Sequence, residues 1–309
     1  MKQRITSIDY LRCICIILMV IFHLAYIGDK YPYAKQFVYT FHMPVFLLIS
    51  GYLVNMSKSP AAFIKTIYWI FIPYAVMETG YITLSAILPV REKVESLSLS
   101  LFIDKLFIHP LGPYWYLHTW MLCSLTCYML NRLLSKANPA NYLLSAGITL
   151  WALSCLGLLS MANAFYFLFG IAIQRYKTDF STFFQPTLLT LLPVCLLAMF
   201  KSNLNRYYLG GIALTYTITS LLLAIHPYLT PALRSVSQYI GRNTLPILLF
   251  SPIFTMLSKP LIPLLAFDST GMIYLVIATT AAIWGSFAIA WSMDKTKLSL
   301  YFCNRKLLV

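Results

Sequence analysis

The sequence predicts an all-α, polytopic integral membrane protein of about ten transmembrane helices. Sixty per cent of its 309 residues are hydrophobic, only 10% are charged, and the mean hydropathy is +0.74. Soluble domains carry about 25% charged residues, so a water-soluble fold of this length could not bury so much apolar surface. The apolar runs match the ~17–25 residues of a membrane-crossing helix and exceed the ~9–11 residues of a crossing strand.

Ten apolar runs, separated by short polar or proline-containing breaks, are the expected helices. They cover residues 8–27, 36–55, 65–88, 114–133, 141–160, 163–176, 185–201, 207–226, 236–258 and 270–292. Lys2 and Arg4 precede the first run, but no small-residue cleavage site follows it, so we expect an uncleaved helix. The stretch 94–111 is too polar to span and predicts an external loop with an interfacial helix. No repeat or linker divides the chain, which favours a single membrane domain over residues 1–309.

The charge distribution predicts that both termini are cytoplasmic. The chain holds 23 Lys and Arg residues and has a net charge of +14. With both termini inside, most of these residues fall on the cytoplasmic side, as the positive-inside trend requires. The outer set is Lys30, Lys35, Arg91, Lys93, Lys105, Lys201, Arg206 and Lys259, of which Lys201 and Arg206 stand out against the trend.

These charges are expected to orient the chain in the membrane and do not indicate nucleic-acid binding. The seven cysteines form no C-x-x-C pair, and most lie in apolar runs where a thiol behaves as a small hydrophobe. We therefore expect no disulfide framework and no metal site.

The first apolar run carries ionisable residues, which are expensive inside a membrane and are candidates for function. Asp9 and Arg12 can pair on one helix face near the inner boundary, although Arg12 could simply extend its charge to the interface. His23 follows Arg12 by eleven residues, about 16 Å along a helix and close to three turns, so both share a face. A neutral histidine in this position is either a packing group or a base.

The second run, 41-FHMPVFLLISGYLV-54, contains a histidine, a proline and a small-residue pair that a simple span does not need. A short loop makes the second helix antiparallel to the first, so His42 should reach the level of His23. Pro44 is expected in the first turn of this helix, where proline is tolerated. Ser50 and Gly51 would permit close contact with another helix.

Further candidates lie in later runs. Glu78 is central in the third helix and either lines a cavity, makes a structural hydrogen bond, or pairs with Arg12 or Arg242. In 112-GPYWYLHTW-120, Trp115 and Tyr116 either bind a ligand or form an interfacial aromatic belt. His118 is more often a packing residue than a ligand group.

The segments 4-RITSIDYLRCICIILMVIFH-23 and 41-FHMPVFLLISGYL-53 resemble the acyltransferase-3 family of membrane-bound O-acyltransferases, and within it the fucose 4-O-acetylase-like group. The matching positions are Arg4, Asp9, Arg12, His23, Phe41, Met43, Pro44, Phe46, Ser50, Gly51 and Tyr52. Weaker similarities follow in 112-GPYWYL-117, 165-FYFLFGIAI-173 and 240-IGRNTLPILLFSP-252.

The resemblance implies a multi-pass protein of the bacterial cytoplasmic membrane. It implies transfer of an acyl group, usually acetyl, from cytoplasmic acyl-CoA to a hydroxyl of an envelope polysaccharide or lipid-linked glycan. It makes His23 the catalytic base, and His42 could stabilise the oxyanion. The expected donor-binding residues are Arg4, Asp9, Arg12 and Arg242. The expected acceptor-binding residues are Ser50, Glu78, Trp115, Tyr116 and His118, and membrane lipids are the remaining expected partners.

Two departures from the family pattern affect the remoter sites. Leu248 and Ser251 stand where the family often has tyrosine and histidine, and only Lys65 precedes the third-helix Pro-Tyr, where the family often has arginine. One alternative is a transporter or flippase for a glycan or small anionic metabolite, but such folds often show inverted repeats that this sequence lacks. Another is a catalytically inactive relative, against which the presence of His23 argues.

Overall fold

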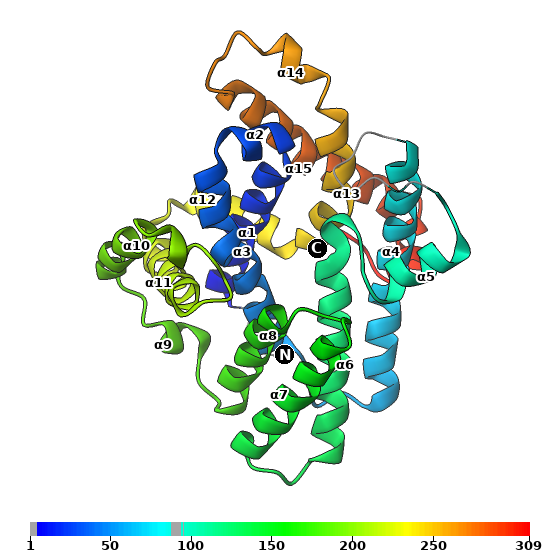
Figure 1. The fold of residues 1–309 in the computed structure, drawn as a ribbon, viewed down its shortest axis with the longest axis vertical. Helices are drawn as coiled ribbons and strands as arrows, with labels where there is room; N and C mark the ends of the chain where they lie inside the picture. Colours follow the sequence, from blue (N-terminus) through cyan, green and yellow to red (C-terminus); the bar gives the residue numbers. More distant parts are fainter. Residues whose placement is uncertain (1–4, 88–93, 95) are drawn as a thin grey trace. The chain divides into compact units, whose positions relative to one another are not determined.

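The computed structural model describes residues 5–87, 94 and 96–309, and all regular structure in these residues is helical (Figure 1). Contacts divide the chain into two compact units. The first comprises Met1–Phe46, Asp179–Ser299 and Lys306–Val309, and the second comprises Leu47–Thr178 and Leu300–Arg305. The all-α prediction is thus confirmed, whereas the single functional domain stays a prediction.

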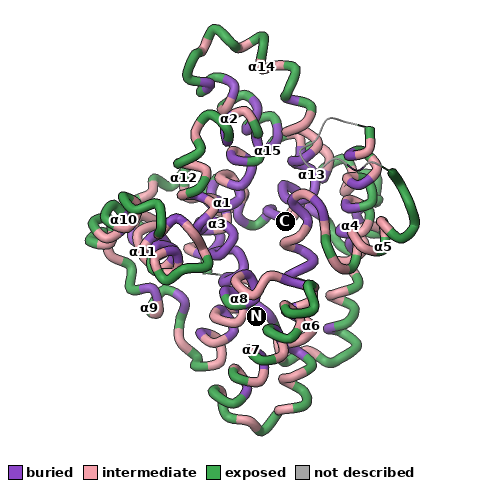
Figure 2. Tube along the Cα trace, in the orientation of Figure 1, coloured by how far each residue is buried: buried purple, intermediate pink, exposed green. Residues whose placement is uncertain are grey.

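The helices of the first unit come from both ends of the chain. They are α1 (Thr6–His23), α2 (Ala25–Lys30), the first part of α3 (Pro32–Leu53), α9 (Phe180–Phe184), α10 (Leu191–Ala198), α11 (Leu209–Ile225), α12 (Pro231–Arg242), α13 (Thr244–Leu257), α14 (Leu261–Leu264), α15 (Met272–Lys295) and the start of α16 (Leu298–Cys303). Short 3-10 turns η2 (Leu188–Thr190), η3 (Lys201–Asn203) and η4 (His226–Tyr228) join them. Helix α1 packs against α12, α13 and α15, and most residues of α1 and α13 are buried, whereas most of α12 is exposed (Figure 2).

Five helical stretches among the described residues are long and apolar enough to cross a membrane. They are α1, α3, α4 (Pro60–Ile87), the α11–η4 stretch Leu209–Tyr228, and α15. The α12–α13 pair makes a sixth if it is one broken span. Exposed Ile64, Val276 and Trp284 leave apolar surface on α4 and α15 that suits lipid. Membrane insertion is therefore supported, but the full count of ten spans and the location of the termini stay predictions.

The expected helix 8–27 ends earlier, because the chain breaks directly after His23. Leu24 adopts extended backbone angles (φ −69°, ψ 99°), and its N–H donates to Ile21. The chain then re-enters a helix as α2. The break makes His23 the last residue of α1, a position that an uninterrupted apolar run did not predict.

The second apolar run also begins earlier than expected. Helix α3 starts at Pro32, so Pro44 lies well inside it and not in its first turn. A proline at this position removes the N–H that would otherwise bond the carbonyl four residues earlier, here Thr40. The hydroxyl of Thr215 lies 3.3 Å from that carbonyl oxygen and also contacts the carbonyl of Gly211 at 2.8 Å. A neighbouring helix thus partly satisfies the carbonyl that Pro44 leaves.

The expected helix 236–258 is two helices, α12 and α13, that meet at an angle of 81°. Asn243 lies at the break, and its side chain explains why the chain can turn there. Its amide donates to the carbonyls of Tyr239 (2.9 Å) and Val309 (3.2 Å), and its carbonyl oxygen accepts from the N–H of Val309 (2.8 Å). These bonds satisfy backbone groups that a sharp bend exposes.

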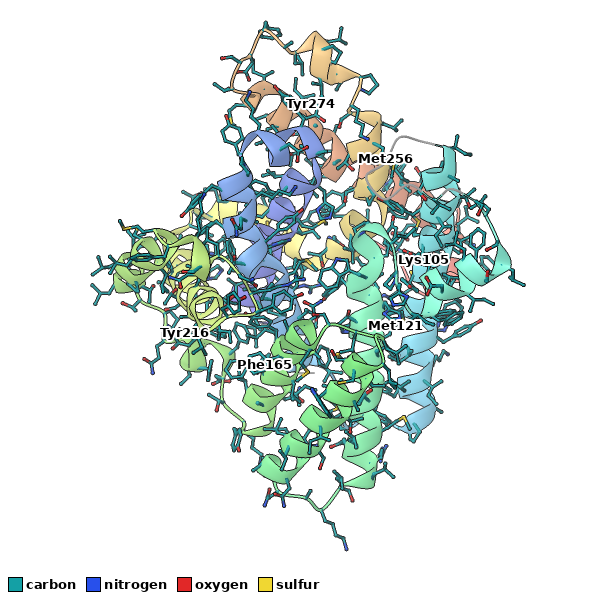
Figure 3. The ribbon with its side chains drawn as sticks, in the orientation of Figure 1. Lys105, Met121, Phe165, Tyr216, Met256 and Tyr274 are labelled. Atoms are coloured by element: carbon teal, nitrogen blue, oxygen red, sulfur yellow. The ribbon has the colours of Figure 1, made fainter. Side chains whose placement is uncertain are left out.

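Aromatic and hydroxyl groups complete the packing of the first unit. The ring of Tyr216 contacts Phe183 and Phe184 with centroids 5.9 and 5.3 Å away. The hydroxyl of Tyr274 on α15 lies 2.9 Å from that of Ser258. Tyr216 and Tyr274 are both labelled in Figure 3. Such tyrosines, of which Tyr274 is buried, contribute apolar area while their hydroxyls remain paired.

The second unit is a helical bundle. It holds the end of α3, α4, α5 (Leu99–Phe107), the turn η1 (Gly112–Tyr114), α6 (Trp115–Leu133), α7 (Pro139–Cys155), α8 (Met161–Arg175) and the end of α16. Helix α5 confirms the helix expected within 94–111, while residue 95 of that stretch and residues 88–93 before it lie outside the described part. Helix α6 contacts α4, α7 and α8 and therefore holds the bundle together.

Glycines allow backbone contact between helices in each unit. A Cβ on Gly51 of α3 would lie 1.9 Å from the carbonyl oxygen of Phe167, and one on Gly170 of α8 would lie 2.0 Å from that of Leu48. This bears out the close helix contact expected at the Ser-Gly pair. In the first unit, a Cβ on Gly241 of α12 would lie 1.8 Å from the carbonyl oxygen of Asp9.

The Gly241 contact predicts that Gly241→Ala destabilises the protein. The new methyl group would force α12 away from α1, and overpacking of this kind costs about 1–3 kcal/mol. The measurement is thermal unfolding of the purified protein in detergent. Gly80→Ala is the matched control, because nothing lies within 4 Å of a Cβ there. Equal melting of Gly241→Ala and the parent protein would contradict the helix contact.

Candidate active site

Two histidines from different helices of the first unit meet around one tyrosine. The ring of Tyr39 lies 6.4 Å from that of His23 and 5.2 Å from that of His42, between centroids. The Tyr39 hydroxyl donates to the carbonyl of Phe22 at 3.1 Å and so connects α3 to the end of α1. The two histidines, referred to below as the histidine pair, therefore lie together as the antiparallel arrangement predicted.

Both histidines use the same ring nitrogen to bond their own helix. The Nδ1 atom of His23 lies 2.6 Å from the carbonyl oxygen of Met19, and that of His42 lies 2.7 Å from the carbonyl oxygen of Val38. A carbonyl oxygen only accepts, so each Nδ1 must carry the hydrogen. In a neutral ring the other nitrogen, Nε2, then carries the lone pair. The helix backbone thus selects the tautomer whose Nε2 can accept a proton.

The two rings differ in accessibility. His42 is 2% exposed, and its Nε2 is buried with no hydrogen-bond partner among the described residues. His23 is exposed. A buried acceptor without a partner is costly, which makes it a candidate to receive a hydrogen bond from a bound molecule. The exposed ring is the one that a reactant reaches more readily.

A second polar group forms near the other end of α1. Arg12 donates to the hydroxyl of Thr244 at 2.7 Å, and the Nε of Arg242 lies 3.9 Å from the carboxylate of Asp9. Arg242 and Thr244 flank the α12–α13 break, so the bend brings both to α1. We call Asp9, Arg12, Arg242 and Thr244 the Arg12 cluster. It joins three of the four predicted donor-binding residues, while Arg4 lies outside the described residues.

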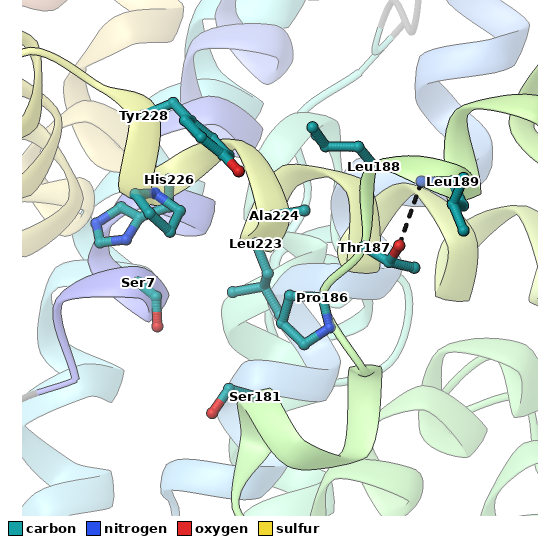
Figure 4. Close-up of a pocket in the computed structure, with 11 residues that line it drawn as sticks. Ser7, Ser181, Pro186, Thr187, Leu188, Leu189, Leu223, Ala224, His226 and Tyr228 are labelled. Carbon is teal, nitrogen blue, oxygen red and sulfur yellow. Dashed lines mark hydrogen bonds between the residues drawn. The ribbon is translucent and has the colours of Figure 1, made fainter.

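A cavity of about 580 Å³, the Ser7 cavity, lies beside the first turn of α1 (Figure 4). Ser7, Ser181, Thr187, His226 and Tyr228 supply its polar and aromatic groups. The ring of His226 also contacts that of Tyr10, with centroids 5.4 Å apart. Ser7, which lines this cavity, is two positions before Asp9 of the Arg12 cluster.

The remaining predicted residues belong to the second unit, where four of them bond to one another or to the backbone. Glu78 is fully buried, and its carboxylate accepts from the N–H of Leu111 at 2.5 Å. His118 donates from Nε2 to the carbonyl of Phe107 at 2.9 Å. These contacts hold the chain on either side of η1. The hydroxyls of Ser50 and Tyr116 lie 2.7 Å apart.

Comparison with known proteins identifies the family. The family model described as an acyltransferase domain, Acyl_transf_3, matches residues 5–291. The chain belongs to the acyltransferase-3 family. No curated protein and no solved structure matches this acyltransferase. The family resemblance is thereby confirmed, whereas the fucose 4-O-acetylase-like subgroup stays a prediction.

The match covers both units of the acyltransferase and every predicted site residue except Arg4. It also includes the α12–α13 break, the departure in α13 at Leu248 and Ser251, and the departure in α4 at Lys65. Leu248 and Ser251 are buried, at 6% and 2% exposed. Their side chains therefore pack inside the first unit.

Sequence reasoning missed two residues of this site, Tyr39 and Thr244. Tyr39 precedes His42 by three positions, a spacing that places both on one face of a helix, but helix register alone does not identify a contact with His23. Thr244 directly follows Asn243, where an expected continuous helix is broken. The Thr244 hydroxyl lies at this 81° bend, within hydrogen-bond distance of Arg12, and a continuous helix would not have indicated that contact.

The Asp9–Arg242 pair predicts that Asp9→Ala destabilises the acyltransferase. Asp9 is 4% exposed, so its removal leaves a half-buried guanidinium without this carboxylate. Breaking a fully buried pair costs about 3–5 kcal/mol, and the partial exposure of Arg242 reduces this to about 1–3 kcal/mol. The measurement is thermal unfolding in detergent of Asp9→Ala, Arg242→Ala and the double variant.

The double variant is the control for this prediction. If the two side chains interact, its destabilisation is smaller than the sum of the two single changes. A strictly additive result would show that the two residues act independently.

Proposed function

We propose that this acyltransferase transfers an acyl group, acetyl in the expected case, from acyl-CoA to a hydroxyl of an envelope polysaccharide or lipid-linked glycan. The observation that carries the proposal is the histidine pair, in which each Nδ1 is bonded to a backbone carbonyl and each Nε2 is left as the basic nitrogen. The site belongs to a multi-pass membrane protein, which we propose resides in a bacterial cytoplasmic membrane.

In the proposed reaction, His23 is the general base. A sugar hydroxyl is a poor nucleophile near neutral pH, so loss of its proton must accompany attack. The hydroxyl oxygen bonds to the thioester carbonyl carbon as Nε2 of His23 takes the proton. The tetrahedral intermediate then collapses, the carbon–sulfur bond breaks, and the imidazolium returns the proton to the coenzyme A sulfur. The products are an ester and free coenzyme A.

We propose that His42 orients the acceptor. A neutral imidazole with its hydrogen on Nδ1 offers a lone pair at Nε2, which suits a hydrogen bond from a hydroxyl. It does not suit an oxyanion, which needs a donor. This tautomer therefore favours an orienting role over the oxyanion role expected from the sequence, and leaves oxyanion stabilisation to a backbone amide or to a protonated ring.

We propose that the Arg12 cluster binds the donor. Guanidinium groups bind phosphate through charge-assisted hydrogen bonds, and Arg12 and Arg242 supply two of them. Arg12 and His23 are eleven residues apart on α1, so the donor must extend about 16 Å along the helix to present its thioester to the base. The Ser7 cavity, beside the same end of α1, is the candidate site for the nucleotide end.

The acceptor-binding role predicted for residues of the second unit stays a proposal, and the contacts of these residues support it to different degrees. The backbone contacts of Glu78 and His118 support structural roles around η1. Ser50 and Tyr116 present hydroxyls that already bond each other. Trp115, whose ring contacts that of Tyr116 at 6.5 Å, offers an aromatic face on which a sugar ring could stack.

The direct test of the function is mass spectrometry of envelope glycans from cells with and without the protein. An acetyl increment that depends on the protein would support the proposal and identify the acceptor. A protein-dependent change in glycan location without any mass increment would instead favour a transporter.

The role of His23 predicts that His23→Ala abolishes most of the glycan acylation. Loss of a general base typically costs about 10²–10⁴-fold in rate. His42→Ala should cost less, because orientation is only one contribution to the rate. The measurement is acylation in cells that express each variant at matched membrane levels. Near-normal acylation by His23→Ala would remove the base from the mechanism.

The proposed role of Arg12 predicts that its removal weakens the binding of the acyl-CoA donor. Arg12→Ala should raise the apparent KM for acetyl-CoA by about tenfold or more, as expected for the loss of one charged hydrogen bond of ~1.5–3 kcal/mol. Thr244→Val is the companion variant, because it removes the hydroxyl that holds Arg12 and keeps the charge. An unchanged KM in Arg12→Ala would place the donor phosphates elsewhere.

A further inference from the structure

A second cavity in the first unit adjoins the histidine pair. It has a volume of about 540 Å³, within the range of about 300–1,000 Å³ that is typical of small-ligand sites. Three segments line it: the end of α2, the first turns of α3 and the loop before α11. The lining residues with polar side chains are Asp29, Lys35, Gln36, Tyr39, Thr40, Asn205, Arg206 and Tyr207. We call it the Tyr39 cavity.

Tyr39 connects this cavity to the proposed chemistry. It lines the cavity, and its ring also lies within 6.4 Å of both histidine rings, between centroids. Lys35, Tyr39 and His42 follow one another at spacings of four and three residues, so they form one stripe along α3. The ring of Tyr39 is therefore the group that lies between a molecule in the cavity and the histidine pair.

The charges that line the cavity are predominantly positive. Lys35 and Arg206 provide two cations, and Asp29 provides one carboxylate, whose oxygen lies 3.8 Å from the Lys35 nitrogen. Asp29 is the more exposed partner, with 63% of its side chain accessible against 19% for Lys35. One carboxylate does not offset two cations, so the lining keeps an excess positive charge.

The sequence provides an independent reason to assign function to these charges. Lys35 and Arg206 both belong to the predicted outer set, and Arg206 stands against the positive-inside trend. The structure brings them into the lining of one cavity although 171 positions separate them in the chain. A binding role explains why basic residues are kept on a side where orientation alone disfavours them.

We propose that the Tyr39 cavity binds the acceptor and selects one that carries an anionic group, a phosphate or a carboxylate. The inference rests on the proposed function of the histidine pair. Lys35 and Arg206 bind the anion, the side chain of Asn205 bonds a neighbouring hydroxyl, and Tyr39 separates the anion from the reacting hydroxyl. The anion has two possible sources, the phosphate of a lipid-linked glycan or the carboxylate of an acidic sugar.

The first test measures the charge preference of the cavity with a reporter cysteine. Gln36→Cys is made in a background in which the exposed Cys155 and Cys195 are replaced by serine. Its rates of modification by a sulfonate-bearing and a trimethylammonium-bearing methanethiosulfonate reagent are compared. The same ratio at Ser202→Cys, an exposed position on η3 that does not line the cavity, is the reference. We expect the anionic reagent to be favoured at position 36 relative to position 202.

Charge-removing variants locate the cause of this preference. Arg206→Gln should lower the ratio of anionic to cationic modification at position 36 by about tenfold, since one charge acts in opposite directions on the two reagents. Lys201→Gln is the matched control, because it removes a charge from the same loop outside the cavity. No preference for the anionic reagent, or equal effects of the two variants, would overturn the proposal.

The second test identifies the anion by protection of the reporter. Glucose 1-phosphate, glucuronate and neutral glucose are each added during modification. Protection by glucose 1-phosphate alone supports a phosphate-bearing acceptor, protection by glucuronate alone supports an acidic sugar, and protection by both supports recognition of either anion. Equal protection by glucose, or no protection by either anionic sugar, would overturn the proposal.

These tests separate the cavity from the catalytic proposal. The reporter measures charge and occupancy without any acyl transfer, so it stays informative in a His23→Ala protein. Normal acylation by His23→Ala would remove the proposed base and leave the binding result standing. A cavity without anion preference would remove the acceptor assignment and leave the acylation result standing.

Discussion

Polar groups that lie among apolar helices need partners inside the protein, and this requirement shapes the whole first unit. Water is not present in the bilayer core to bond them. Asp9 meets Arg242, Arg12 meets Thr244, and the carbonyl left by Pro44 approaches the Thr215 hydroxyl. Each of these contacts joins segments that are far apart in the sequence. The few polar side chains therefore decide which helices pack together.

The same requirement prepares the histidine pair for chemistry. A histidine within a helix can satisfy one N–H by bonding the carbonyl one turn earlier, and both His23 and His42 do so. That local bond needs no contact with another helix, yet it fixes the tautomer and the orientation of the ring. The proposed base is thus positioned by its own helix, while Tyr39 fixes the distance between the two helices.

Sequence reasoning reached the fold class, the family and the meeting of His23 with His42, because long apolar runs and short loops leave few arrangements for neighbouring helices. It failed at positions where a helix ends or bends at one residue inside a continuous apolar run. Leu24 ends α1 without a proline or glycine to signal it, and Asn243 breaks an apolar stretch through bonds to Val309, a residue 66 positions away. The Arg12 cluster and the Tyr39 cavity depend on such long-range contacts, which no local pattern encodes.

The end of α1 at His23 has an electrostatic consequence. Aligned peptide dipoles give the C-terminus of a helix a partial negative charge of roughly half an electron, and a cation at that position gains about 0.3–1 kcal/mol, up to about 2 when partly buried. In the proposed mechanism, His23 becomes positive when it takes the acceptor proton. The field of α1 then favours the charge-separated state. An uninterrupted helix through residue 27 would have placed the same ring about one turn before the C-terminus, where this interaction is weaker, and His42 lies still farther from the end of α3.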